Sequence, residues 1–357
     1  MGLRPAGLRL AGLRPGGLKL AGLKLAALAL TLATPAGAQT IRLATWNPGL
    51  SREGPGLLLR DIQRADPQVL AAAQIIAATA PDAILLTGFD WDYDARALTA
   101  FAGLLADQGH PMPHQFAAQP NSGMATGLDM DGDGRAGRAR DAQGYGSFTG
   151  QSGMAILSRL PITGTTDHTP TLWRDLPGHR MPASPHADIQ RLSSTAHWDV
   201  ALQTPAGPLH LLALSATPPA FEPRNIPRNH DELTFWLHHL PDAPFAIIGN
   251  LNLDPMDGDG DPTALTALLQ ITQDPQPRGA FQPPQTGPNA DHKGDPALDT
   301  AEYDRPPGNL RLDYILPAQH LTVTDAGILW PAPDDPLAET ARLASHRKLV
   351  WLDLDLE

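Results

Sequence analysis

Short apolar runs that end in polar or turn-forming residues recur along this chain, and they constrain its fold more than any other feature. Strand-like runs cover residues 41–46, 82–86, 153–158, 197–202, 209–215, 245–249, 311–316, 321–329 and 349–354. Helical patterns cover 66–80, 95–106 and 229–240, and Asp66-Pro67 provides an N-cap followed by proline in the first turn. Because strands outnumber helices, the pattern predicts an α/β domain of two packed sheets with helices outside.

The N-terminal segment has the pattern of a targeting sequence. Residues 1–24 carry five basic residues and no acid, and an apolar run at 25–33 is followed by Ala36-Gly37-Ala38. This predicts a secretory signal peptide over 1–38 and an exported mature domain over 39–357, periplasmic or extracellular. The alternatives are an amphipathic surface helix or a membrane anchor, but the apolar run is too short to span a bilayer. No later stretch has the pattern of a membrane span.

Charge and cysteine content exclude several classes of protein. The chain has 26 Lys and Arg against 38 Asp and Glu, a formal charge of −12, so it has no strong nucleic-acid-binding signature. It has no cysteine, which excludes disulfides, iron–sulfur clusters and a thiol nucleophile. Its 33 glycines and 37 prolines follow no collagen period and indicate many turns and long loops, such as 108–150.

Polar side chains follow several of the predicted strands, where α/β proteins collect functional sites. The principal segments are Thr45-Trp46-Asn47, 85–94, 247–255, 311–316 and 344–351, with supporting segments at 150–159, 192–194, 197–200, 228–236 and 308–311. In this order they resemble the endonuclease/exonuclease/phosphatase superfamily, most closely a bacterial exported branch, from Ile41 to Leu356. The resemblance implies a four-layer sandwich of two mixed β-sheets flanked by helices. It also implies phosphoester hydrolysis with a divalent metal, magnesium or manganese.

The resemblance also implies roles for individual positions. In the family pattern an Asn and a Glu hold the metal, an Asp and an Asn orient water and phosphate, an Asp-Tyr segment steadies a histidine, and an Asp-His pair completes the site. A further histidine ends a middle strand. Four positions match this pattern: Asn47, Asn252, Asp313 and His346. Four do not: Gly88 replaces the Glu, Ser215 the middle-strand His, Asn250 the water-aligning Asp and Ser345 the Asp of the terminal pair.

Each of these four replacements removes a charge or a titratable group. Together they favour a pseudoenzyme, with a cleft that binds a phosphorylated small ligand or a partner protein. One alternative is an active hydrolase in which Asp90, Asp254 or the acidic cluster 257–261 supplies metal ligands. Asp90 would lie about 6–7 Å from the lost Glu along the strand. Another alternative is an interaction domain without a ligand.

A second acidic constellation lies in the long loop. Asp129, Asp131 and Asp133, with Gly134, match positions 1, 3, 5 and 6 of a calcium loop. Position 12, which holds a bidentate Glu in a calcium loop, is Arg140 here, and the carboxylate of Asp141 follows one residue later. The pattern predicts a calcium-stiffened loop over 129–141, with an ordinary solvated acidic turn as the alternative.

The remaining candidates favour structural roles. His230 with Asp231 and Glu232 is expected to begin a helix capped by Asn229, rather than to contact substrate. Five tryptophans are expected in the core and not on a stacking platform: Trp173, Trp198, Trp236, Trp330 and Trp351.

Overall fold

The computed structural model describes Gly2 and residues 39–356. The predicted signal peptide therefore lies, Gly2 apart, outside the described residues. Within the described part of the chain, no helix combines the length and the apolar character that crossing a bilayer requires.

The larger sheet has seven strands in the order β3-β4-β2-β1-β12-β11-β9. Their bounds are β1 Gln39–Trp46, β2 Ala83–Phe89, β3 His114–Phe116, β4 Gly153–Ser158, β9 Arg278–Gly279, β11 Thr322–Leu329 and β12 Leu349–Leu356. The sheet is mixed, because β1 pairs in parallel with β2 and antiparallel with β12. The first and last strands of the described residues are thus adjacent in the middle of this sheet.

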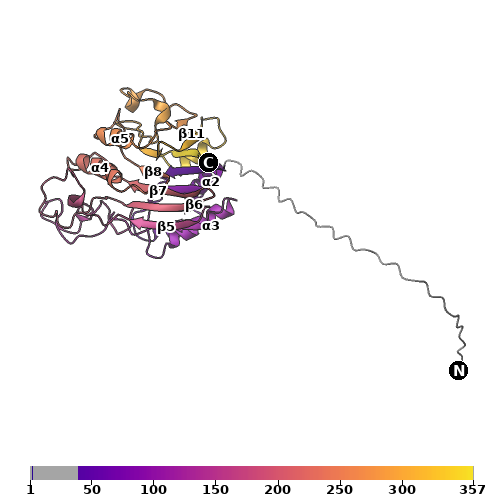
Figure 1. Ribbon diagram of the computed structural model, residues 1–357, viewed down its shortest axis with the longest axis horizontal. Coiled ribbons are helices and arrows are strands. Elements are labelled where there is room, and N and C mark those ends of the chain that lie inside the picture. The colour runs from indigo at the N-terminus through magenta and orange to yellow at the C-terminus, as the bar shows by residue number, and fades with distance from the viewer. Residues whose placement is uncertain (1, 3–38, 357) are drawn as a thin grey trace, which may run out of the picture. The chain divides into compact units, whose positions relative to one another are not determined.

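The smaller sheet has five strands in the order β10-β8-β7-β6-β5. Their bounds are β5 Ile162–Asp167, β6 His197–Thr204, β7 Gly207–Ser215, β8 Phe245–Asn250 and β10 Asp313–Pro317. Figure 1 shows β5 to β8 side by side in sequence order. This sheet is also mixed, since β7 and β8 are parallel and the other pairs antiparallel.

Helices form the outer layers of the sandwich. The larger sheet packs against α1 Leu57–Gln63, α2 Pro67–Thr79, α3 Arg96–Asp107 and α6 Ala338–Ala344, and the smaller sheet against α4 Asn225–Thr234 and α5 Thr263–Leu268. Short 3₁₀ turns are η1 Ala139–Asp141, η2 Trp173–Asp175, η3 Phe235–His238, η4 Gly287–Asn289 and η5 Pro296–Leu298. As predicted, Asp66 caps α2 by accepting hydrogen bonds from the amides of Gln68 and Val69, at 3.0 and 3.3 Å.

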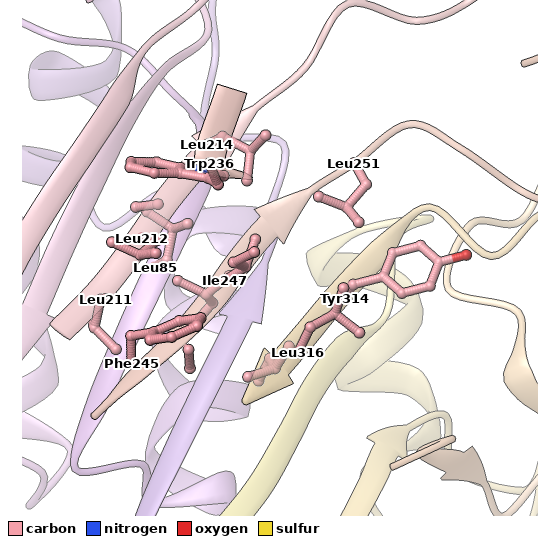
Figure 2. Close-up of a cluster of buried hydrophobic side chains, with 14 of the residues drawn as sticks. Leu85, Leu211, Leu212, Leu214, Trp236, Phe245, Ile247, Leu251, Tyr314 and Leu316 are labelled. Carbon is pink, nitrogen blue, oxygen red and sulfur yellow. The ribbon is translucent and has the colours of Figure 1, made fainter. Parts of the chain in front are cut away.

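Side-chain alternation explains why the larger sheet is buried on both faces. In β2, Ala83 and Leu85 belong to the core between the sheets, whereas Ile84 and Leu86 belong to the core beneath the helices. Figure 2 shows Leu85 in the same cluster as Leu211 and Ile247 of the smaller sheet. The predicted four-layer sandwich of two mixed sheets is therefore confirmed.

The structure corrects the predicted helix over 229–240. The α-helix begins at Asn225 and ends at Thr234, and a 3₁₀ turn continues to His238. Asn229 is not a cap: it lies inside α4, and its buried amide donates to the carbonyls of Thr217 and Leu251, both at 2.8 Å. The helix differs from the prediction because Asn229 forms hydrogen bonds to backbone carbonyls of two neighbouring loops, which the local sequence pattern does not reveal.

The acids beside Asn229 serve the same purpose. Asp231 accepts from the Trp173 indole and the Arg180 amide, both at 2.6 Å, and Glu232 accepts from the amides of Ser194 and Thr217.

Four of the five tryptophans expected in the core are buried there: Trp173, Trp198, Trp236 and Trp330. Trp351 is only half-buried and lies under the Arg42 guanidinium.

Candidate functional site

The strand ends of both sheets meet at one site. Ser215 of β7 and Asp313 of β10 each pair in register with Asn250, the last residue of β8. From the larger sheet, Asn47 follows β1 directly, and the Ser345 hydroxyl donates to the Asn47 carbonyl at 2.8 Å. The positions selected from the family pattern therefore come together from segments that are distant along the chain.

Gly88 lies against Asn47 in a conformation that favours glycine. Its φ is +61°, and the β2–β4 pairing shifts register at this residue. A Cβ built on Gly88 would lie 2.8 Å from Asn47 Cγ and closer still to its Oδ1. No side chain can occupy position 88 unless Asn47 moves.

Arg347 fills the centre of the site. Its Nη2 donates to Asp313 Oδ2 at 2.6 Å and to Asn250 Oδ1 at 3.1 Å, and its Nε donates to Asp313 Oδ2 at 3.1 Å. The two side chains of this ion pair are 6% and 0% exposed. Burial lowers the pKa of Arg347, but Asp313 and Tyr303 together outweigh that effect and the pKa is raised, so the guanidinium stays charged.

The side chain that pairs with Asp313 is Arg347 and not a histidine. Asp313 was expected to steady a histidine, yet its cationic partner is Arg347, and the His346 side chain lies outward, with its ring 5.8 Å from that of Tyr303. Partial burial and the cations of Arg347 and Lys348 lower the pKa of His346. The sequence analysis did not select Arg347, although it lies directly after His346.

Asn250 and Asn252, the two asparagines at and after the end of β8, form hydrogen bonds within the site. Asn250 Oδ1 also accepts from the Asn252 amide at 3.1 Å, and Asn252 Nδ2 donates to the Ala216 carbonyl at 2.6 Å. Thr300, which the sequence analysis did not select, donates from its hydroxyl to Asp313 Oδ2 at 2.9 Å. An open hollow of about 520 Å³ adjoins the site and is lined in part by Arg52, Ser345 and His346.

The profile of the Endonuclease/Exonuclease/phosphatase family matches residues 44–345. This chain belongs to that family. A solved family member from Beutenbergia cavernae shares 18% identity with a TM-score of 0.55, covering 89% of this chain and 72% of that one. A family protein from Leptotrichia buccalis shares 12% identity with a TM-score of 0.53, covering 88% and 99%. At these identities the similarity to the two solved structures shows the fold alone. A search of curated proteins found no match.

The endonuclease/exonuclease/phosphatase site in this chain does not fit a catalytic dication. Among its eight positions, Asp313 is the one carboxylate, and it is paired with a buried guanidinium. Asp313 Oδ1 has no hydrogen-bond partner among the described residues. Magnesium requires a near-octahedral set of oxygen ligands, usually with carboxylates, and a single carboxylate oxygen beside a fixed cation does not provide it.

Two of the substitute ligands considered from the sequence, Asp90 and Asp254, already accept hydrogen bonds. Asp90 accepts from the Ser51 hydroxyl and from the amides of Arg52 and Ser152, at 2.7 to 2.9 Å. Burial raises the pKa of Asp90, although these three hydrogen bonds oppose the shift. Asp254 accepts three backbone amides, including that of Arg311 at 2.8 Å. Both carboxylates stabilise loop backbone in this structure.

The acidic loop brings its three carboxylates together as predicted. Ligand atoms of Asp129, Asp131 and Asp133 lie within 4.8 Å of one another, so the cluster could hold a metal ion. Asp129 accepts from three loop amides, and Asp141 accepts from the Met130 amide at 2.9 Å. Arg140, at position 12, instead pairs with Glu222 at 3.3 Å.

Proposed function

We propose that this protein is an exported member of the endonuclease/exonuclease/phosphatase family that does not hydrolyse phosphoesters with a divalent metal, and that it retains its cleft for binding. The buried ion pair of Arg347 and Asp313 supports this proposal most strongly. The fixed guanidinium neutralises the carboxylate and repels a dication from the place where the family pattern needs negative charge. The four lost ionisable groups act in the same direction.

Metal titration and a hydrolysis assay test the proposal together. We expect neither magnesium nor manganese to bind at the cleft, and a generic phosphodiester to remain intact at metal concentrations that saturate active family members. Asn47→Ala is the matched control, because an authentic cleft activity requires Asn47 under the family pattern. Metal-dependent hydrolysis that disappears in Asn47→Ala would establish an active enzyme and overturn the proposal.

The binding role has a separate test. We expect inorganic phosphate to raise the melting temperature of the wild-type protein if phosphorylated ligands occupy the hollow beside His346. The shift should shrink in His346→Ala, which leaves the buried ion pair untouched. An identical shift in the two proteins would place phosphate elsewhere, and no shift would favour a protein partner for the cleft.

We also propose calcium as the ion of the acidic loop. The carboxylates of Asp129, Asp131 and Asp133 are hard oxygen ligands at calcium-loop spacing, which supports calcium over softer metals. Calcium should raise the melting temperature of the wild-type protein, and Asp131→Ala should abolish the effect. An unchanged melting temperature with millimolar calcium would leave the loop an ordinary acidic turn.

Export is the remaining part of the proposal. The five basic residues, apolar run and Ala36-Gly37-Ala38 at the N-terminus support secretion followed by cleavage after Ala38. Expression of the full chain with a C-terminal tag, followed by cell fractionation and mass spectrometry, should recover a periplasmic or extracellular product that begins at Gln39. An uncleaved cytoplasmic product would contradict this part alone.

A further inference from the structure

Three buried titratable side chains form a cluster outside the family site. Asp257 lies in the loop after β8, His292 lies between η4 and η5, and Asp299 directly follows η5. Their side chains are 7%, 3% and 2% exposed. None of the three occupies a position that the family pattern assigns.

The imidazole of His292 lies between the two carboxylates. Its Nδ1 is 3.2 Å from Asp257 Oδ2, and its Nε2 is 3.6 Å from Asp299 Oδ2. Neither His292 Nε2 nor Asp299 Oδ2 has a hydrogen-bond partner among the described residues. A separation of 3.6 Å is too long for a hydrogen bond, and leaving two such atoms unpaired is costly in a buried site.

We propose that His292 Nε2 and Asp299 Oδ2 bind a divalent transition-metal ion, with zinc as the first choice. At metal–ligand distances of about 2.1 and 2.2 Å, a separation of 3.6 Å corresponds to a ligand–metal–ligand angle of about 115°, near the tetrahedral value. A mixed set of imidazole nitrogen and carboxylate oxygen suits zinc better than magnesium or calcium. Water would complete the coordination.

Asp257 lies where a carboxylate would orient His292 as a metal-binding histidine. Such a histidine usually directs its other ring nitrogen to a carboxylate, which fixes the ring and its tautomer. Here Asp257 Oδ2 lies beside Nδ1, and Asp257 is itself fixed by the amides of Lys293 and Gly294, at 2.7 and 2.8 Å. The free nitrogen, Nε2, is thereby directed at Asp299.

The local charge also favours a cation. The carboxylates of Asp254, Asp257 and Asp295 all act on Asp299, so negative charge is concentrated around it. A bound dication would offset this negative charge and stabilise the Asp299 carboxylate. The cluster is also linked to the family site, because Asp299 precedes Thr300, whose hydroxyl donates to Asp313 at 2.9 Å. The ion would therefore fix the loop that holds Asp313.

The test uses the purified, untagged protein after chelation, with zinc as the probe and excess calcium present to saturate the acidic loop. We expect one zinc per chain, a higher melting temperature with zinc, and a zinc X-ray absorption spectrum that contains one imidazole ligand. Asp299→Asn keeps the shape of the side chain but removes the anionic ligand, and should weaken zinc binding by about 10-fold or more. Asp257→Asn should weaken it by about 10–100-fold.

Asp295→Asn is the matched control, because it removes one neighbouring charge from the same segment without removing a proposed ligand. Its zinc affinity should stay close to that of the wild-type protein. His292→Gln should lose zinc binding, and circular dichroism establishes that each variant is folded. No zinc binding by the wild-type protein, or equal affinity in Asp299→Asn and wild type, would overturn the metal site. That result would leave a metal-free Asp–His–Asp cluster and would not affect the proposed loss of catalysis.

Discussion

Arg347→Ala should strongly destabilise the fold, because it leaves Asp313 as a buried charge without its cationic partner. The substitution removes three hydrogen bonds, two to Asp313 and one to Asn250, and leaves the Thr300 hydroxyl as the remaining side-chain donor to Asp313. Breaking a buried ion pair from one side costs about 3–5 kcal/mol. Both side chains are almost fully buried, so solvent cannot take over the lost partner.

Urea unfolding measures this effect as a change in midpoint at constant m-value. Arg342→Ala is the matched control, because Arg342 forms an exposed pair with Glu339 on α6, and it should leave the midpoint unchanged within error. The double variant Asp313→Asn/Arg347→Met should recover most of the lost stability, since both buried charges are absent. A loss below about 1 kcal/mol in Arg347→Ala would refute the view that this pair is a fixed, desolvated unit.

Three further predictions follow from single features of the structure. Gly88→Ala should lower stability by more than about 1 kcal/mol in urea unfolding, because the new Cβ meets Asn47; Gly127→Ala, also at positive φ but with open space, should cost less. Burial lowers the pKa of His197 to about 3, so the free energy of unfolding should be highest above about pH 6.5 and fall by about 2 kcal/mol at pH 5. His197→Gln should remove this dependence of the unfolding free energy on pH, and an unchanged dependence would contradict the prediction. Calcium should slow proteolysis of the 129–141 loop in the wild-type protein but not in Asp131→Ala, as mass spectrometry of the fragments would establish.

The sequence predicted the strands and the longer helices well where apolar runs are continuous. It missed β5, whose residues are mostly exposed because β5 is an edge strand, and it missed α1, α5 and α6, which span only two turns or fewer. Such short helices contain too few residues to establish a period of 3.6. The helix at α4 was shifted because its polar residues are buried by contacts with distant loops, which a local pattern does not reveal.

The sequence by itself predicted the family order of segments and the four positions at which the ionisable groups of the family pattern are absent, since these depend only on which residue stands where. The tertiary structure decided which cation pairs with Asp313. Arg347 and Asp313 are separated by 33 intervening residues, and only the pairing of β10 with β8 and the return of the chain into β12 bring them together. A buried charge acquires its role from the partners that surround it, and those partners come from the folded chain as a whole.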